Sequence, residues 1–272
     1  MPFSLIFIVA AIQGVTEFLP VSSSGHLVLI PSVTSHPYQG QTIDVAAHIG
    51  TLIAVLIYLR QDILNISVAT FSQTNSAKQT HHQHLGLMIV GATIPLALVG
   101  FMVNYADWHW LRLVTTIAWA NIAFAGLLFV ADRFGGQWHG LADMRWPAAI
   151  CIGLMQICAL IPGASRSGVT ITAARFFNYD RITAARFSLL LSLPAIAGAG
   201  LLKSIDIIDA GDTQLGYDAA AVAVLSALFA LLAIRIMMSW LAKANFTIFV
   251  VYRLALGIIL LVGLELSLLA TS

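Results

Sequence analysis

The chain of 272 residues is 59% hydrophobic and only 9% charged, whereas about 25% of the residues in an ordinary soluble domain are charged. With a mean hydropathy of +0.91, this composition excludes a soluble globular domain and predicts an all-α polytopic membrane protein. The formal net charge of +1 carries no functional information, and we expect no nucleic-acid partner. No basic residue precedes the first apolar stretch, so we expect no cleaved signal peptide.

Six apolar stretches are long enough to cross about 30 Å of hydrocarbon: residues 42–59, 85–104, 113–131, 184–202, 219–240 and 247–269. Two further apolar segments, 3–31 and 146–177, are each interrupted by a proline and a serine–glycine run. Their halves are too short to cross, so we predict that each segment forms a re-entrant helix–loop–helix hairpin. A pair of interrupted segments at corresponding places in two halves of a chain indicates a binding site within the membrane.

The two interrupted segments share one order of features, written GVTEFLPVSSSGH at residues 14–26 and GLMQICALIPGASRSGV at 153–169. Each passes from an apolar helix with one polar group, through a proline, to a Ser-x-Ser-Gly turn, and each precedes three spans. Because three is odd, the second half must be inserted upside down relative to the first. We therefore predict a single membrane domain of two inverted repeats, about 1–132 and about 146–270.

The basic residues predict the orientation of the domain in the membrane. One side carries Arg60, Lys78, Arg133, Arg145, Arg175, Arg181, Arg186 and Lys243. The other side carries Arg112 and Lys203 together with the acidic residues Asp206, Asp209, Asp212 and Asp218. By the positive-inside rule the first side is cytoplasmic. Both termini then face outward, and the first hairpin enters the membrane from outside.

Glu17 is one of very few carboxylates within apolar sequence, and Gln13 lies four residues before it, on the same face of a helix. A buried carboxylate must be paired, protonated or bound to a metal. Oxygen ligands of this kind suit Mg²⁺ or Ca²⁺, so we predict that Gln13 and Glu17 hold a divalent cation or the substrate. The alternative is a structural ion pair between Glu17 and Arg166 that joins the two halves.

A serine run begins five residues after Glu17, and its backbone N–H groups at a helix start suit an anion. It consists of Ser22, Ser23 and Ser24, and His26 closes it. We predict that Ser22 and Ser24 contact the substrate and that Ser23 is a candidate nucleophile. His26 titrates near neutrality and can give or take a proton, although a structural role is the alternative.

Arg166 lies in the second interrupted segment, where an arginine at the bilayer centre costs about 3–17 kcal/mol. Its planar fork of donors matches phosphate oxygens. Ser165, Ser167 and Thr170 add hydroxyl groups, and Gly163 lets the backbone approach a ligand closely. This loop by itself predicts an anion site. Together with the carboxylate, serines and histidine of the first loop, it indicates phosphoryl transfer.

Two long motifs stand in order along the chain, QGVTEFLPVSSSGH at residues 13–26 and PGASRSGVT at 162–170, supported by DVAAHIGT at 44–51 and RFS at 186–188. They resemble the undecaprenyl-pyrophosphate phosphatase family, the bacitracin-resistance proteins of bacterial inner membranes, over essentially the whole chain. The family's acidic motif then falls on Gln13 and Glu17, and its serine–histidine motif on Ser23 and His26. Its arginine motif falls on Gly163, Ser165, Arg166, Ser167 and Thr170.

The resemblance implies hydrolysis of undecaprenyl diphosphate to the monophosphate, which regenerates the lipid carrier for peptidoglycan precursors. It also implies a bacterial inner-membrane protein whose partner is a polyprenyl diphosphate lipid and whose active site opens to the periplasm. Because the first acidic position is Gln13, a metal would need oxygen ligands from substrate or water.

Two other functions are consistent with parts of the pattern. A lipid-carrier flippase or anion transporter would use the same inverted repeats. A lipid phosphatase of the acid-phosphatase-like superfamily needs a second histidine six residues after the arginine, where this chain has Thr172. The sequence leaves open whether water or Ser23 attacks, which metal is preferred, whether the protein is a homodimer, and what His48 and Glu265 do.

Overall fold

The computed structural model describes residues 1–27, 29–31, 39–71, 77–105, 110, 113–208 and 213–266. Within these ranges the chain is helical, and its one β-type contact is an isolated bridge between His139 and Tyr179. The helices are α1 Phe3–Thr16, α2 Ser23–Leu27, α4 Gln41–Tyr58, α5 Arg60–Phe71, α6 Ala77–Tyr105, α7 Val114–Phe134, η2 Leu141–Asp143, α8 Trp146–Gln156, η3 Ile157–Leu160, α9 Arg166–Phe176, α10 Arg181–Ile208, α11 Thr213–Leu241 and α12 Thr247–Glu265. The predicted all-α fold is confirmed.

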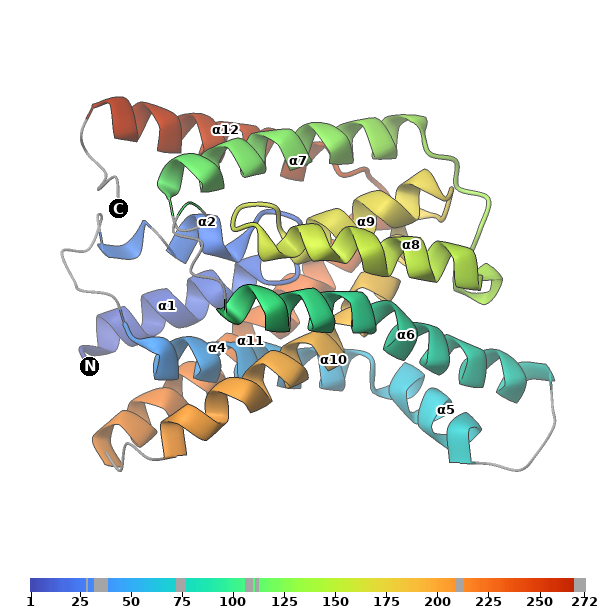
Figure 1. The fold of residues 1–272 in the computed structure, drawn as a ribbon, viewed down its shortest axis with the longest axis horizontal. Coiled ribbons are helices and arrows are strands. Elements are labelled where there is room, and N and C mark those ends of the chain that lie inside the picture. The colour runs from blue at the N-terminus through green and yellow to red at the C-terminus, as the bar shows by residue number, and fades with distance from the viewer. Residues whose placement is uncertain are drawn as a thin grey trace.

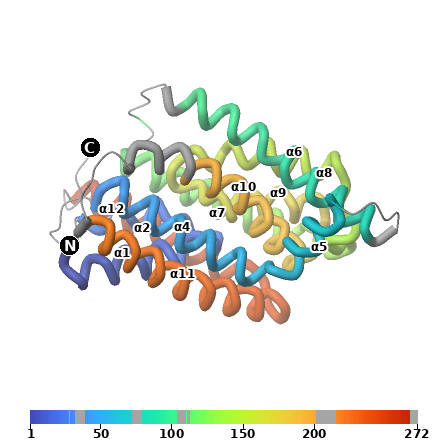
Figure 2. The backbone as a smooth tube through the Cα atoms, turned by 90° about the horizontal axis from the view of Figure 1, so that it is seen from below, coloured from blue at the N-terminus to red at the C-terminus, as the bar shows by residue number. Residues whose placement is uncertain are grey.

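Six of the described helices, α4, α6, α7, α10, α11 and α12, are long and apolar enough to cross a membrane. They correspond to the six predicted spans, and they lie lengthwise beside one another (Figure 1). Figure 2 shows the same alignment from a second direction. Many of their outward side chains are large and apolar, such as Leu98, Trp119 and Val224, as hydrocarbon contact requires. The end of the last predicted span, 267–269, lies outside the described residues.

The observed helices differ from the predicted apolar spans where polar residues begin or extend a helix. α10 starts at Arg181 and not at 184, because the Asp180 carboxylate accepts a hydrogen bond from the backbone N–H of Thr183 at 2.8 Å and caps the first turn. The helix α5, which is too polar to read as a span, was not predicted.

The two interrupted segments form the predicted hairpins. α1 and α2 begin and end at one end of the bundle, whereas α8, η3 and α9 begin and end at the opposite end (Figure 1). Each turn contains a serine with positive φ, 71° at Ser22 and 67° at Ser165, and each follows a proline that cannot donate to a helix. The turns therefore stop both hairpins partway along the bundle, where they meet.

The hairpins pack crosswise between the two halves of the chain. α1 packs on α11, and α8 packs on α6. A glycine makes each contact close: a Cβ atom at Gly14 would lie 2.7 Å from the Ser226 carbonyl oxygen, and one at Gly153 would lie 2.3 Å from that of Ala92. These two glycines begin the two similar sequence segments. The inverted duplication of about 1–132 and about 146–270 stays a prediction. Such a duplication would produce matching glycine contacts of this kind in the two hairpins.

The ends of several helices meet at one end of the bundle, on the right in Figure 1. Basic residues at or next to these helix ends gather there: Arg60, Arg133, Arg145, Arg181 and Lys243. Arg175, which we had counted as a loop cation, is fully buried and donates to Asp132 Oδ1 at 3.1 Å and to the Gly135 carbonyl oxygen at 2.8 Å. It joins α9 to the end of α7. Of the opposite side, Arg112, Asp209 and Asp212 lie outside the described residues.

Candidate active site

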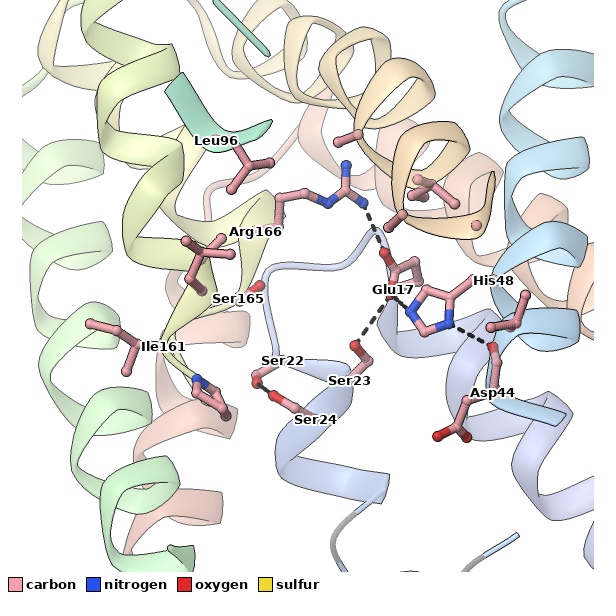
Figure 3. Close-up of a pocket in the computed structure, with 18 residues that line it drawn as sticks. Glu17, Ser22, Ser23, Ser24, Asp44, His48, Leu96, Ile161, Ser165 and Arg166 are labelled. Carbon is pink, nitrogen blue, oxygen red and sulfur yellow. Dashed lines mark hydrogen bonds and ion pairs between the residues drawn. The ribbon is translucent and has the colours of Figure 1, made fainter. Parts of the chain in front are cut away.

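A cavity of about 400 Å³ lies where the two turns meet and is flanked by α4, α6 and α10 (Figure 3). One part of its lining is polar and comes mainly from the turns: Glu17, Ser22, Ser23, Ser24, Asp44, His48, Ser165 and Arg166. The other part is apolar: Val45, Leu96, Ala159, Leu160, Ile161, Pro162, Ala195, Ile196, Ala199 and Gly200. The cavity therefore suits a ligand with a charged head and an apolar tail.

Glu17 lies at the centre of the polar wall, and its side chain is 8% exposed. Its Oε1 atom accepts a hydrogen bond from Arg166 Nη2 at 2.9 Å. Its Oε2 atom accepts from Gln13 Nε2 at 2.8 Å and from Ser23 Oγ at 3.2 Å. The ion pair between Glu17 and Arg166 that we had named as the alternative is therefore present. Both side chains of this pair line the cavity, and the predicted role of Glu17 in binding a cation or the substrate stays a prediction.

The two serine turns have the same local geometry. Ser22 Oγ accepts from the Gly25 N–H at 3.4 Å, and Ser165 Oγ accepts from the Gly168 N–H at 3.1 Å. Each serine thus caps the helix that follows it, α2 or α9, as serines commonly do. The positive φ of both residues places the next side chain, Ser23 or Arg166, at the cavity. Both of these side chains contact Glu17.

Two further hydrogen bonds join the turns. The Gly163 N–H donates to Ser24 Oγ at 3.0 Å, and Ser167 Oγ donates to the Leu19 carbonyl oxygen at 2.9 Å. Gly163 has a φ of 95°, and a Cβ atom there would lie 2.3 Å from the Ile117 carbonyl oxygen of α7. A glycine is therefore required at this position on both conformational and steric grounds. The turns form one rigid unit against α7.

Arg166 keeps one free donor despite its ion pair. Its Nη1 atom is buried and has no hydrogen-bond partner among the described residues. The guanidinium carbon lies 5.9 Å from the centre of the Phe18 ring, which helps to fix its plane. Arg166 thus has a hydrogen-bond donor that Glu17 does not use, while its side chain lines the cavity.

Four predicted binding residues support the cavity without lining it. Gln13 is fully buried beneath Glu17. Gly163 and Ser167 make the contacts between the turns. The Thr170 hydroxyl is buried. It lies at hydrogen-bond distance from Ser188 Oγ, at 2.7 Å, and from the Arg166 carbonyl oxygen, at 2.9 Å, so it joins α9 to α10. Their predicted contact with substrate stays a prediction, whereas their support of the turns is visible.

His26 lies near the cavity but not in its lining. Its Nδ1 atom is 2.7 Å from the Ser22 carbonyl oxygen, which can only accept, so Nδ1 carries the proton. Its Nε2 atom is 2.5 Å from the Tyr252 hydroxyl, and the two rings stack with centroids 5.5 Å apart. His26 therefore holds the carbonyl of the strained Ser22. Its predicted role as general acid or base stays a prediction.

Sequence reasoning did not assign roles to two groups that the fold brings to the site. His48 of α4 lines the cavity with its Nε2 atom 3.7 Å from Glu17 Oε2, while its Nδ1 atom is 2.7 Å from the Asp44 carbonyl oxygen. Arg253 of α12 is fully buried and contacts the turn that precedes Arg166. The signal that could have identified Arg253 was a lone arginine within an apolar span. Glu265 lies exposed at the end of α12, away from the cavity.

Gln13 and Glu17 fit a divalent cation only in part. Gln13 Oε1 is a buried acceptor without a partner among the described residues, but it is Gln13 Nε2 that faces the Glu17 carboxylate. No group of three or more His, Cys, Asp or Glu side chains in the described part of the chain forms a cage for a metal. Mg²⁺ commonly takes one or two protein carboxylates and completes its shell with water and phosphate oxygens, which matches this set.

The comparisons with known proteins place the chain in one family. The model of the family described as bacitracin resistance protein BacA matches residues 6–259. A protein of Roseobacter denitrificans named undecaprenyl-diphosphatase is 42% identical, over 94% of this chain and 97% of its own length. Proteins with the same name from Ruegeria pomeroyi and Alteromonas mediterranea are each 43% identical, over 94% of this chain and 96% of their own. The chain belongs to the bacitracin resistance protein BacA family.

Proposed function

We propose that the protein hydrolyses undecaprenyl diphosphate to undecaprenyl phosphate and inorganic phosphate, and so recycles the lipid carrier used in peptidoglycan synthesis. The name shared by relatives about 40% identical over nearly the whole chain supports this activity. The observation that carries it is the two-sided cavity, in which Glu17, Ser23 and Arg166 face the small apolar residues of α10. A diphosphate on a prenyl chain matches both sides.

Arg166 and the turn around Ser165 hold the phosphate groups in this proposal. The guanidinium of Arg166, which lines the cavity, binds a phosphate oxygen, while its bond to Glu17 fixes the orientation of the fork. The N-terminus of α9 adds its helix dipole at the same place. These donors are positioned before substrate arrives, so they stabilise the charge that develops on phosphorus without reorganising.

Glu17 accepts a proton from the attacking group. Ser23 Oγ donates to Glu17 Oε2, so its lone pairs are free for phosphorus or for a water molecule. If Ser23 attacks the terminal phosphorus, its proton passes to Glu17 and the bond to undecaprenyl phosphate breaks. Water then releases phosphate from the serine. If water attacks the terminal phosphorus, it loses a proton to Glu17, the bond to undecaprenyl phosphate breaks and inorganic phosphate forms directly. A phosphoserine trapped by rapid acid quench would distinguish the first route from the second.

A divalent cation, Mg²⁺ or Ca²⁺, belongs to the proposal. Glu17 and Gln13 Oε1 would hold it, and it would neutralise charge on the diphosphate oxygens when bound. Both carboxylate oxygens of Glu17 already accept hydrogen bonds, Oε1 from Arg166 and Oε2 from Gln13 and Ser23, so the cation would share them with these donors.

We also propose that the protein lies in the bacterial inner membrane with the cavity open to the periplasm. The cavity is lined by the first turn of α4 and by residues 195–200 of α10. Both segments lie toward the end of the bundle opposite the cluster of basic residues (Figure 1). The positive-inside rule assigns that basic end to the cytoplasm. Labelling of single cysteines introduced at each end, in sealed cells, tests the orientation.

The first experiment is phosphate release from undecaprenyl diphosphate by the protein purified in detergent, with and without EDTA. Glu17→Gln removes the carboxylate at nearly constant size, and Glu265→Gln makes the same change at an exposed position outside the cavity. We expect release that EDTA suppresses, Glu17→Gln abolishes and Glu265→Gln leaves unchanged. A well-folded wild type that releases no phosphate but moves the lipid between leaflets of vesicles would make the protein a flippase.

A further inference from the structure

Arg253 is an unusual residue for the middle of a spanning helix. It lies seven residues into α12 and is fully buried. An arginine in this position is costly unless its donors are satisfied. Among the described residues no carboxylate pairs with it, in contrast to Arg166 and Arg175, which pair with Glu17 and Asp132.

The donors of Arg253 are directed at the turn that carries the phosphate clamp. Its Nη2 atom donates to the carbonyl oxygens of Gly163 and Ala164, both at 2.9 Å. Its Nε atom donates to Asn121 Oδ1 of α7, also at 2.9 Å. One side chain therefore ties the turn to two spanning helices, directly to α12 and through Asn121 to α7.

These contacts fix the direction of two successive peptide groups. Because a trans peptide is planar, its N–H points opposite to its carbonyl. When Arg253 holds the Ala164 carbonyl, the N–H of Ser165 is turned away from α12. Ser165 itself lines the cavity. The same turn contains residues with positive φ at Gly163 and Ser165, a conformation that persists only when its surroundings hold it.

Arg253 also differs from Arg166 in its charge balance. The charge of Arg166 is compensated by Glu17 at 2.9 Å, whereas Arg253 contacts only neutral oxygens among the described residues. Its Nη1 atom has no partner in this part of the chain and lies against α9, where a Cβ atom at Gly168 would be 2.6 Å from it. An uncompensated positive charge at the start of α9 attracts an anion bound there, with little screening in a buried site.

We propose that Arg253 is a positioning residue for the phosphate site. It holds the turn of residues 163–165 in the anion-binding conformation and provides the positive charge that the pair of Glu17 and Arg166 lacks. This inference rests on the proposed diphosphate substrate. It differs from a purely structural role because it predicts a change in affinity for the diphosphate in protein that is fully folded.

The test is the affinity of purified protein for radiolabelled undecaprenyl diphosphate, with KM and kcat measured alongside. Arg253→Lys retains the charge but cannot bridge the two carbonyl oxygens and Asn121. Arg253→Met removes the charge as well as these hydrogen bonds. We expect Kd to rise roughly tenfold or more in the methionine variant and by less in the lysine variant. We expect KM to follow Kd, with partial rescue by lysine.

Two controls separate positioning from folding. Arg175→Lys changes an equally buried arginine at the other end of α9 and should lower the melting temperature without changing Kd of the folded fraction. Asn121→Ala removes the support of Arg253 Nε and should weaken binding in the same direction as Arg253→Lys. Folded Arg253→Met that binds the diphosphate with a Kd within about twofold of wild type would overturn the proposal.

The binding measurement also separates this inference from the proposed activity. If wild-type protein binds the diphosphate without hydrolysing it, the proposed phosphatase activity is refuted. The Kd values of the Arg253 variants still decide whether Arg253 positions the phosphate site. A folded wild type that binds no diphosphate refutes both.

Discussion

Replacing Arg166 by alanine tests the central element of the site. The change removes the Nη1 donor that no described residue uses, together with the bond from Nη2 to Glu17. Loss of a single positioned donor to developing charge costs about 10²–10³ in rate. Because Arg166 carries a full charge, we expect kcat/KM for undecaprenyl diphosphate to fall by about 10³-fold, which corresponds to about 4 kcal/mol.

The same substitution should leave the protein folded. Removing one partner of a buried ion pair costs about 3–5 kcal/mol when the remaining charge is uncompensated. Here Glu17 retains the Gln13 amide at 2.8 Å and the Ser23 hydroxyl at 3.2 Å, and it borders the cavity. We therefore expect a smaller loss, visible as a modest decrease in melting temperature in detergent.

The assay is steady-state phosphate release, normalised to the monodisperse fraction of each variant. Arg235→Ala is the matched control, because Arg235 is exposed on α11 and lies outside the cavity. The double variant Glu17→Gln with Arg166→Ala separates the two interpretations of the ion pair. If the pair were only structural, removing both charges would restore activity. Arg166→Ala with kcat/KM within about twofold of wild type would refute the clamp.

Three further outcomes follow from the geometry. Glu17→Gln should retain the fold but lose the proton acceptor, with kcat reduced by about 10²–10⁴; an unchanged kcat with only KM raised would contradict this. His26→Gln should keep at least about tenfold more activity than His26→Ala, because an amide can still donate to Ser22, and equal losses would support proton transfer by His26. Gly163→Ala should lower both melting temperature and activity, since the new Cβ would meet the α7 backbone 2.3 Å away, and normal melting would show that the turn adapts.

Much of this fold follows from the sequence because the bilayer restricts what an apolar chain can do. Apolar length predicted the six spans, and the prolines with serine–glycine turns predicted both hairpins. The ends of the helices were predicted less accurately than their number, because a helix end depends on single capping hydrogen bonds. One example is the bond that the Thr183 N–H donates to the Asp180 carboxylate. The hairpin glycines, Gly14 and Gly153, were quoted without a role, because their close contacts depend on which helices become neighbours.

The site was predictable where residues adjacent in sequence act together, as in the Glu17 and Arg166 motifs. It was not predictable where α4 or α12 supplies a residue from a distance. His48 reaches Glu17 because α4 passes beside the first turn, and Arg253 reaches Gly163 because α12 packs on α7. In the sequence each appears as a polar residue in a largely apolar helix, where a packing role and a functional role look the same.

The two turns show how one backbone conformation can serve two chemical purposes. Ser22 and Ser165 share a positive φ, cap the next helix and direct the following side chain to the cavity. That side chain is Ser23 in the first turn and Arg166 in the second, and each bonds a different oxygen of Glu17. The carboxylate therefore receives a hydroxyl on one side and a guanidinium on the other. Because the hairpins enter from opposite ends, the candidate nucleophile and the candidate phosphate clamp of the proposed reaction come from different hairpins and meet at one carboxylate.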